Sequence, residues 1–206
     1  LLVDARAAQA HSAEGEPMTP TTVPAAHYDF LTERDGELHA DPDVLDRVFA
    51  GLDPVPVSHL TGRWRGREIL SGHPLDRSLS RVGWYGKDFD GPDEVRPILL
   101  STAGGRVYAI DPGRLPTAVL LSPPALPGAV DRVLRRGLDL LRPALATDRY
   151  TASLRTIGHG DQRTAAMVYD KQPIVDVFTT LDDDLVLGAM QYRGMERPYY
   201  FLLQRS

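Results

Sequence analysis

From Tyr150 to its end, the chain divides into five short segments of similar length, separated by residues typical of turns. The segments are YTASLRTIGHG, QRTAAMVYDKQ, PIVDVFTTLDDD, LVLGAMQYRGMERP and YYFLLQRS, with turns at 158–161, 170–171, 182–184 and 194. This spacing is typical of an antiparallel meander. Because a row of such strands can curl and close, it predicts a barrel or half-barrel with an inner cavity.

The part of the chain before Tyr150 mixes helical and strand patterns. Asp41 can cap a first short helix, and His73 stands where the cap of a second one belongs. Helical patterns cover 40–52, 72–83 and 129–145, and strand-like patterns cover 61–70, 84–102 with a loop at 90–93, and 104–113. The predicted fold class is therefore α+β: an antiparallel β-barrel-like sheet with a few flanking helices.

The predicted domain organisation is an arm followed by one barrel-like domain. Residues 1–40 have sparse, unpatterned apolar positions, so we expect a flexible N-terminal arm. Met18 is a candidate natural start, which leaves open whether 1–17 belong to the native protein. We expect a single domain over 41–206, made of a motif-bearing part (41–100), a helical connection (101–149) and the C-terminal meander (150–206).

Charge and composition exclude several function classes. The net charge of −5 implies no basic surface, so nucleic acid is not expected as a partner. The absence of cysteine removes disulfides, thiolate metal sites and thiol nucleophiles together. No apolar run has the length of a transmembrane helix, and the first residues do not have the pattern of a signal peptide. We expect a cytoplasmic protein without a membrane partner. The sequence leaves open whether it forms a homodimer.

Five motifs occur in a fixed order: GRWRG, GHPLD, WYGKDF, AMVYDKQPIVDVF and LGAMQYRG. With them the chain resembles the bacterial family named for its GXWXG motif, in which a motif-bearing N-terminal part is paired with a C-terminal domain of unknown function. The resemblance covers roughly residues 41–205 and implies no catalytic residues. The chain also resembles, more distantly, lipocalin and nitrobindin-like barrels, whose first strand carries a Gly-x-Trp motif and which hold small apolar ligands or haem.

Two positions depart from the pattern expected of the GXWXG family. Thr179 and Thr180 follow DVF where an arginine is usual, and Gln191 follows LGAM where an aspartate is usual. If the two replaced charges face each other in a cavity, the ligand or activity of this chain differs from that of its relatives.

The two glycine–tryptophan clusters hold the only tryptophans of the chain. We expect Trp64 to be structural and to close one end of the barrel, with an arginine from a late strand stacked across its ring. Gly62 and Gly66 fit this role, because glycine lets a neighbouring backbone approach a large ring. Direct contact between Trp64 and a ligand is the alternative.

The second cluster contains Trp84, Tyr85 and Lys87. Adjacent residues of a strand face opposite sides, and alternation puts Lys87 on the side of Tyr85. Exposure to solvent is the favoured environment of Lys87. The alternative is an inward lysine that binds an anionic group or acts as an acid or base.

Tyr169, Asp170 and Asp176 form the best polar group of the C-terminal half. Alternation places Asp176 on the same face as Ile174 and Phe178, and burial of that face would raise the pKa of its carboxyl, as a general acid or base requires. Alternatively, the intervening valines face inward and Asp176 faces water. Asp170 lies in a turn and is expected to be structural. The candidate catalytic residues are Asp176, Tyr169 and Lys87.

The remaining candidate positions concern ligands, metals and cofactors. The expected ligand-binding residues are Trp84, Tyr85, His73, Met167, Phe178, Met190, Gln191 and Tyr192. No two histidines have metal-ligand spacing, so neither a protein-built metal site nor a cofactor is expected. A single axial histidine for haem remains an alternative, with His73 or His159 as the candidate.

Two functions from different classes follow, with a purely structural or interaction module as the third. The first is a protein that binds a small hydrophobic or amphipathic molecule in the barrel. The second is a cofactor-independent isomerase or cyclase of bacterial secondary metabolism, which folds a polyene- or polyketide-like substrate and acts by shape plus acid–base catalysis. A cavity lined by Asp176, Tyr169 or Lys87 favours the enzyme. A cavity without ionisable groups favours the carrier, and a barrel filled with side chains favours the structural module.

Overall fold

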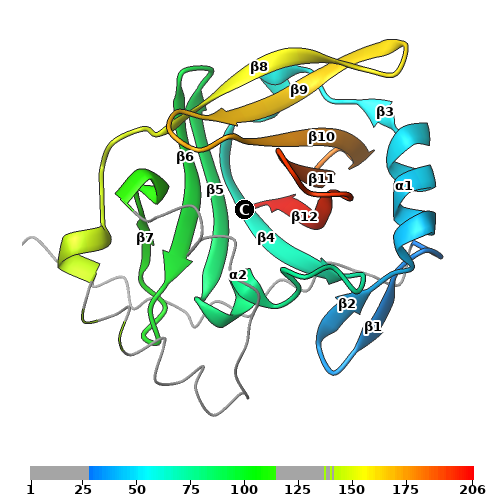
Figure 1. The fold of residues 1–206 in the computed structure, drawn as a ribbon. Coiled ribbons are helices and arrows are strands. Elements are labelled where there is room, and N and C mark those ends of the chain that lie inside the picture. The colour runs from blue at the N-terminus through cyan, green and yellow to red at the C-terminus, as the bar shows by residue number, and fades with distance from the viewer. Residues whose placement is uncertain (1–27, 115–136, 138–139, 141) are drawn as a thin grey trace, which may run out of the picture.

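The computed structural model describes residues 28–114, 137, 140 and 142–206 (Figure 1). The predicted arm before residue 28 and most of the helix predicted over 129–145 lie outside the described residues. Among the described ranges, no helix is long and apolar enough to cross a membrane.

Eight antiparallel strands form a closed barrel, which confirms the predicted architecture (Figure 1). The order round the barrel is β4-β12-β11-β10-β9-β8-β6-β5, and pairing of β4 with β5 closes it. The bounds are β4 (Gly62–Leu70), β5 (Trp84–Gly91), β6 (Glu94–Ser101), β8 (Ala152–His159), β9 (Gln162–Tyr169), β10 (Ile174–Asp182), β11 (Leu185–Tyr192) and β12 (Tyr199–Arg205). The five segments predicted after Tyr150 are therefore the five consecutive strands β8 to β12.

The other elements are short and lie outside the ring of eight strands. They are β1 (Thr32–Arg34), β2 (Glu37–His39), β3 (Asp53–Pro54), β7 (Val107–Ala109), α1 (Pro42–Gly51), α2 (Ser78–Arg81) and the 3-10 turns η2 (Val57–His59) and η3 (Pro112–Arg114). The cap predicted for α1 is present, because the Asp41 carboxylate accepts hydrogen bonds from the amides of Asp43 and Val44 at 2.9 and 3.0 Å. The described part of the chain is mostly β, with few helices.

The prediction of a loose arm up to residue 40 is wrong for its described part, 28–40. β1 and β2 form a hairpin, and β2 pairs in parallel with the end of β4. Leu31 and Leu38 are buried in a second core that lies between α1 and the outer face of the barrel. Two buried leucines and strand pairing fix this segment, although its sequence shows little periodicity.

Alternation along β10, β11 and β12 separates this outer core from the barrel interior. On β12, Tyr199 and Phe201 point inward, whereas Tyr200 and Leu202 belong to the outer core. Asp176 is buried between inward-pointing Ile174 and Phe178 on β10. The interior is filled mainly by aromatic and aliphatic side chains.

The second predicted helix is shorter than its pattern. α2 begins only at Ser78, and its cap is Arg77, whose backbone is left-handed (φ 67°). His73 lies in a turn before the helix, where its Nδ1 accepts a hydrogen bond from the Leu75 amide at 3.1 Å. The predicted role of His73 as cap of a helix over 72–83 is therefore wrong, because the chain reverses at 73–76 before the helix begins.

Candidate functional site

An irregularity in β5 turns Lys87 into the barrel. The pairing of β5 with β6 shifts register on both sides of Gly86. A side chain at Gly86 would lie 1.9 Å from the carbonyl oxygen of Trp64, so only glycine lets β4 and β5 approach here. The shift places Lys87 inside together with Trp84, whereas Tyr85 stays outside. The predicted solvated lysine on the side of Tyr85 is wrong, because a β-bulge interrupts the alternation.

The Lys87 ammonium forms an ion pair with Asp176 inside the barrel. Nζ lies 2.7 Å from Asp176 Oδ2, and the two side chains are 4% and 1% exposed. Nζ also donates a hydrogen bond to the carbonyl oxygen of Pro97 at 3.1 Å. Both side chains therefore point into the barrel, which is the second environment considered above for Lys87 and the first considered for Asp176.

Three aromatic rings surround the same ammonium. Nζ lies 5.0 Å from the ring centroid of Phe201, 5.7 Å from that of Trp84 and 5.9 Å from that of Tyr169. Such contacts stabilise a desolvated cation through the negative faces of the rings. The rings therefore help to keep Lys87 inside the barrel, away from water.

The Asp176 carboxylate is the less completely satisfied partner. Among the described residues, its second oxygen, Oδ1, has no hydrogen-bond partner. Burial raises the pKa of the Asp176 carboxyl, and the Lys87 ammonium opposes this shift. Burial, with the Asp176 charge next, also raises the pKa of the Tyr169 hydroxyl well above its ordinary value. Tyr169 is thus neutral, and Asp176 keeps one oxygen free for a partner.

A cavity of about 40 Å³ lies at this group, beneath α2. It is mainly apolar, and its polar side chains are Lys87, Asp176, Tyr169, Tyr199 and Ser78. The cavity is lined in addition by Leu75, Leu79, Trp84, Ile98, Ile174, Met190 and Phe201. This volume suffices for a few water molecules, whereas sites for organic ligands usually measure several hundred Å³.

Glu68 holds α2 over the cavity through hydrogen bonds. Its two carboxylate oxygens accept hydrogen bonds from the amides of Leu79 and Ser80 at 2.9 and 2.8 Å, and from the hydroxyl of Tyr199. Burial, followed by the Glu68 charge, raises the pKa of Tyr199 well above its ordinary value. Sequence reasoning missed both residues. Alternation along the strand could have indicated Glu68, because it lies on the same face as Trp64 and Gly66.

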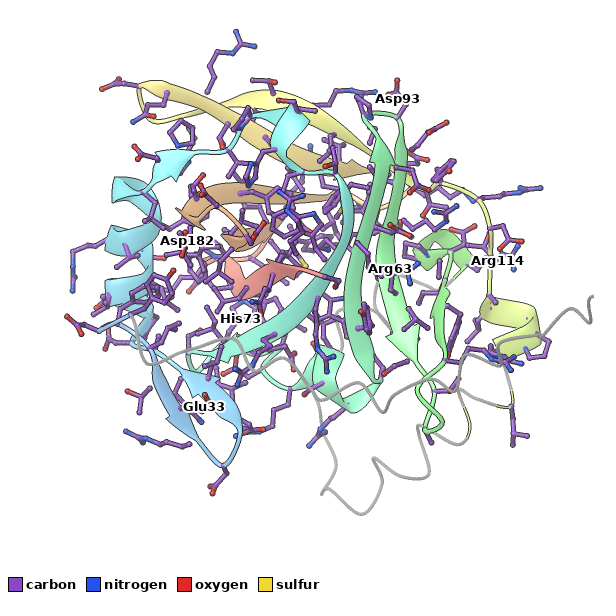
Figure 2. All side chains as sticks on the ribbon, turned by 180° about the vertical axis from the view of Figure 1, so that it is seen from behind. Glu33, Arg63, His73, Asp93, Arg114 and Asp182 are labelled. Carbon is purple, nitrogen blue, oxygen red and sulfur yellow. The ribbon has the colours of Figure 1, made fainter. Side chains whose placement is uncertain are left out.

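An open groove of about 590 Å³ lies on the other side of the 73–76 turn, and we call it the outer groove. It is lined by Pro42, Asp46, Ser71, Gly72, His73, Pro74, Leu75, Tyr200 and the loop 194–198. The His73 ring lies 5.4 Å from the ring of Tyr199 on β12, and Figure 2 labels this histidine close to β4 and β12. Burial lowers the pKa of His73, so its imidazole is neutral near pH 7.

Trp64 is fully buried in the inner core, away from the cavity lining. The guanidinium of Arg205, on the last strand, lies 4.3 Å from its ring centroid, and the indole donates a hydrogen bond to the Thr61 carbonyl oxygen at 3.0 Å. A side chain at Gly66 would lie 2.2 Å from the Trp84 ring, so this glycine makes room for the other tryptophan. A side chain at Gly62 would meet no atom within 4 Å, so this glycine does not make room for a ring; it has a left-handed backbone instead (φ 76°), which corrects the role expected of it.

The structure brings only part of the predicted ligand set to the cavity. Trp84 and Met190 line it, whereas Met167 and Phe178 are buried in the surrounding core. His73 lines the outer groove instead. Three further positions lie outside the cavity lining: half-buried Tyr85, exposed Gln191 and half-buried Tyr192.

The neutral residues at the two unusual motif positions do not face each other. Gln191 pairs with Val175, and Thr179 pairs with Leu187, four residues along the strand. The hypothesis of a facing pair of replaced charges is therefore wrong for this barrel.

Metal ligands do not gather in the described part of the chain. It contains no group of three or more His, Asp or Glu side chains placed to hold a metal ion. His159, one of the two candidates for haem, packs against Phe49 with ring centroids 4.9 Å apart, outside the cavity lining.

Comparisons with known proteins agree with the two halves of the motif pattern. Residues 47–105 match the family described as "GXWXG protein", and residues 150–205 match "Domain of unknown function (DUF4334)". A solved structure, "Crystal structure of protein from Thermomonospora curvata", is 30% identical with a TM-score of 0.60, over 82% of this chain and 89% of that one. No curated protein matches the sequence.

Proposed function

The chain belongs to the family in which a GXWXG segment precedes the DUF4334 domain, and we propose that it is a cofactor-independent isomerase or cyclase for a small, mainly apolar substrate. The observation that carries the proposal is the free Oδ1 of Asp176, held beside Lys87 in the lining of an apolar cavity. Neither half of the family name states an activity, and the support for this function is the geometry of Asp176 and Lys87 in the cavity.

The ion pair is better explained by chemistry than by stability. Desolvation of two charges offsets most of their attraction, and apolar replacements of buried pairs are often as stable. Buried ionisable groups with shifted pKa values that line a cavity are typical of functional sites. A binding protein for an apolar ligand does not need the charges of Lys87 and Asp176 at this place.

The chemistry that fits is transfer of one proton within the substrate. The Asp176 carboxylate, made more basic by burial, takes a proton from a C–H next to a carbonyl or diene. The same carboxyl returns it to another carbon, so a double bond moves, no atom is lost and no co-reactant is needed. Lys87 has three N–H donors, of which two serve Asp176 and Pro97. The third is available to an oxygen that gains negative charge.

The carrier remains the second candidate, and the aromatic interior favours it. Trp84 and Phe201 offer apolar faces to a ligand, whether or not a reaction follows. Binding alone does not separate the two functions, because both need it. Transfer of a proton to or from carbon separates them.

The test follows, by NMR, migration of the double bond in a panel of medium-chain β,γ-unsaturated ketones to give the conjugated isomers. The wild-type protein is expected to catalyse this migration. Asp176→Asn keeps the shape of the side chain and should lower the rate by about 10²–10⁴-fold while binding persists. The matched control is Asp88→Asn, since Asp88 is the next residue to Lys87, is also buried, and pairs with Arg63 and Arg96 instead of lining the cavity. Equal rates in wild type and Asp176→Asn would leave only the carrier.

A further inference from the structure

The cavity and the outer groove are unequal in size and complementary in character. The cavity of about 40 Å³ holds the reactive groups, but it accepts at most a small end of a substrate. The groove of about 590 Å³ has the size of a usual ligand site, but Lys87 and Asp176 do not line it. A substrate that reacts at Asp176 therefore needs space beyond the cavity.

Leu75 is shared by the two spaces. Among the described residues, it is the one side chain that lines both the cavity and the outer groove. It is only 3% exposed, so it is closely packed where the two linings meet. Displacement of this side chain would enlarge both spaces at that point.

The turn that carries Leu75 is stabilised by hydrogen bonds among residues 71–76. The Asp76 amide donates to the His73 carbonyl oxygen, and the Leu75 amide donates to the His73 ring. The Asp76 carboxylate accepts from the amides of Ser71 and Gly72 at 3.1 and 2.8 Å. Because Ser71 lies before Gly72, the bond from its amide to Asp76 ties the turn to the chain that follows β4.

The residues on either side of the turn suit a hinge. Gly72 (φ 82°) and Arg77 (φ 67°) have left-handed backbones at its two ends. Beyond Arg77, α2 is held by Glu68 through the amides of Leu79 and Ser80. The Ser78 amide, at the start of α2, also donates to the Leu75 carbonyl oxygen at 2.9 Å. A motion about the two ends that displaces Leu75 would therefore break this bond and the one from Ser71 to Asp76, while the bonds of Glu68 hold the rest of α2, as in enzymes whose loops open for a substrate.

The charges of the outer groove select against anions. Arg197 is already paired with Asp43 at 2.6 Å and with Asp46 at 3.5 Å. Glu196 adds a further negative charge, and the lining contains no lysine. Pro42, Pro74, Met195, Pro198 and Tyr200 supply the apolar surface. An uncharged chain fits this surface better than a carboxylate of equal length.

From these observations we infer that the substrate is an elongated, uncharged, mainly apolar molecule that extends past Leu75, with its reacting end in the cavity and its remainder in the outer groove. This inference rests on the proposed function, because it places the reacting end at Asp176. Leu75 determines which molecules enter: it has to move aside for each substrate, and the groove beyond it accommodates the length.

The probes for binding are straight-chain 2-alkanones from heptanone to undecanone, followed through the fluorescence of Trp84 in the cavity lining. Affinity is expected to rise about fourfold per added methylene, as burial of each such group predicts. The carboxylates of equal length should bind more weakly. Affinity that does not depend on chain length, or equal affinity for the carboxylates, would overturn the inference.

The kinetic variants are Leu75→Ala and its matched control Leu31→Ala, which removes the same atoms from a buried side chain of the outer core that lines neither the cavity nor the outer groove. Stopped-flow association should be about tenfold faster for Leu75→Ala, because opening is no longer needed, and unchanged for Leu31→Ala. Equal acceleration in both variants would contradict the role of Leu75.

A second measurement uses the absence of cysteine from the chain and does not depend on the alanine variants. The thiol of Leu75→Cys should react with a thiol reagent about tenfold faster than that of Leu60→Cys, at a buried inner-core position, if the turn opens under native conditions. Equal rates would show that the turn stays closed.

The proposed enzyme activity and the proposed site that extends past Leu75 can be rejected independently of each other. Length-dependent binding that needs Leu75, without migration of the double bond, would reject the enzyme and keep the site that spans the cavity and the outer groove. Migration that depends on Asp176, without any effect of chain length or of Leu75, would reject the spanning site alone.

Discussion

Lys87 and Asp176 stand on opposite walls of the barrel, and their side chains meet in its interior with Nζ 2.7 Å from Oδ2. β5 and β10 are four strands apart in either direction round the ring of eight, so no strand pairing brings these residues together. Their contact depends on closure of the whole barrel and on the bulge at Gly86. The pair is thus a sensitive probe of both the fold and the site.

Removal of one partner should destabilise the barrel far more than removal of both. Lys87→Met leaves the Asp176 charge buried without its cation and should lower the free energy of unfolding by about 3–5 kcal/mol. The double variant Lys87→Met/Asp176→Leu should recover most of this loss, because no charge remains inside. Urea unfolding of the four proteins of this cycle measures the coupling. A double variant no more stable than Lys87→Met would contradict a charged pair.

The stability difference between the wild type and Asp176→Asn should depend on pH with a defined sign. Burial raises the pKa of Asp176 in the folded state above the value of 3.8 for an ordinary aspartate. As pH rises from 3.8 towards the folded pKa, the unfolded chain releases this proton first, so the contribution of Asp176 to stability falls and then stays constant. Asp176→Asn lacks this titration. Its stability relative to the wild type should therefore increase with pH across that window, and an opposite slope would show that Lys87 outweighs burial.

Trp64→Ala should lower the free energy of unfolding by about 3–5 kcal/mol, as expected for truncation of a large buried aromatic side chain. The physical reason is loss of packing in the inner core and of the ring that lies under Arg205. Trp64→Phe, which keeps a ring, should lose less. Thermal and urea unfolding measure both. A stable Trp64→Ala that fails only to bind 2-alkanones would instead place Trp64 in the ligand site.

Gly66→Ala should displace the Trp84 ring, because the new methyl group would lie 2.2 Å from it. We expect a loss of about 1–3 kcal/mol from overpacking, together with a shift of Trp84 fluorescence. Gly158→Ala is the control, since Gly158 also lies in a strand and has open space at its Cβ position. If both variants retain the fluorescence of the wild type, Gly66 is not needed for the position of Trp84.

The strands and their order in the meander could be predicted from local pattern alone. Alternation and turn residues mark β8 to β12, because each strand buries one face and each reversal needs residues that tolerate a tight turn. The ordered motifs supplied the family, which the comparisons then confirmed. The sequence also identified Asp176 as a candidate, but left its direction open, since either face of a β10 segment rich in apolar residues could have pointed inward.

The candidate site itself depends on contacts between distant parts of the chain. Local alternation placed Lys87 outside, and only the backbone contact between Gly86 and Trp64 shifts it inward. Glu68, Tyr199 and Leu75 escaped notice because hydrogen bonds to α2 and the division of a cavity from a groove have no local pattern. Periodicity along one strand determines which faces are apolar. Only the closed barrel decides which side chains from opposite walls share its interior, and therefore which of them are desolvated.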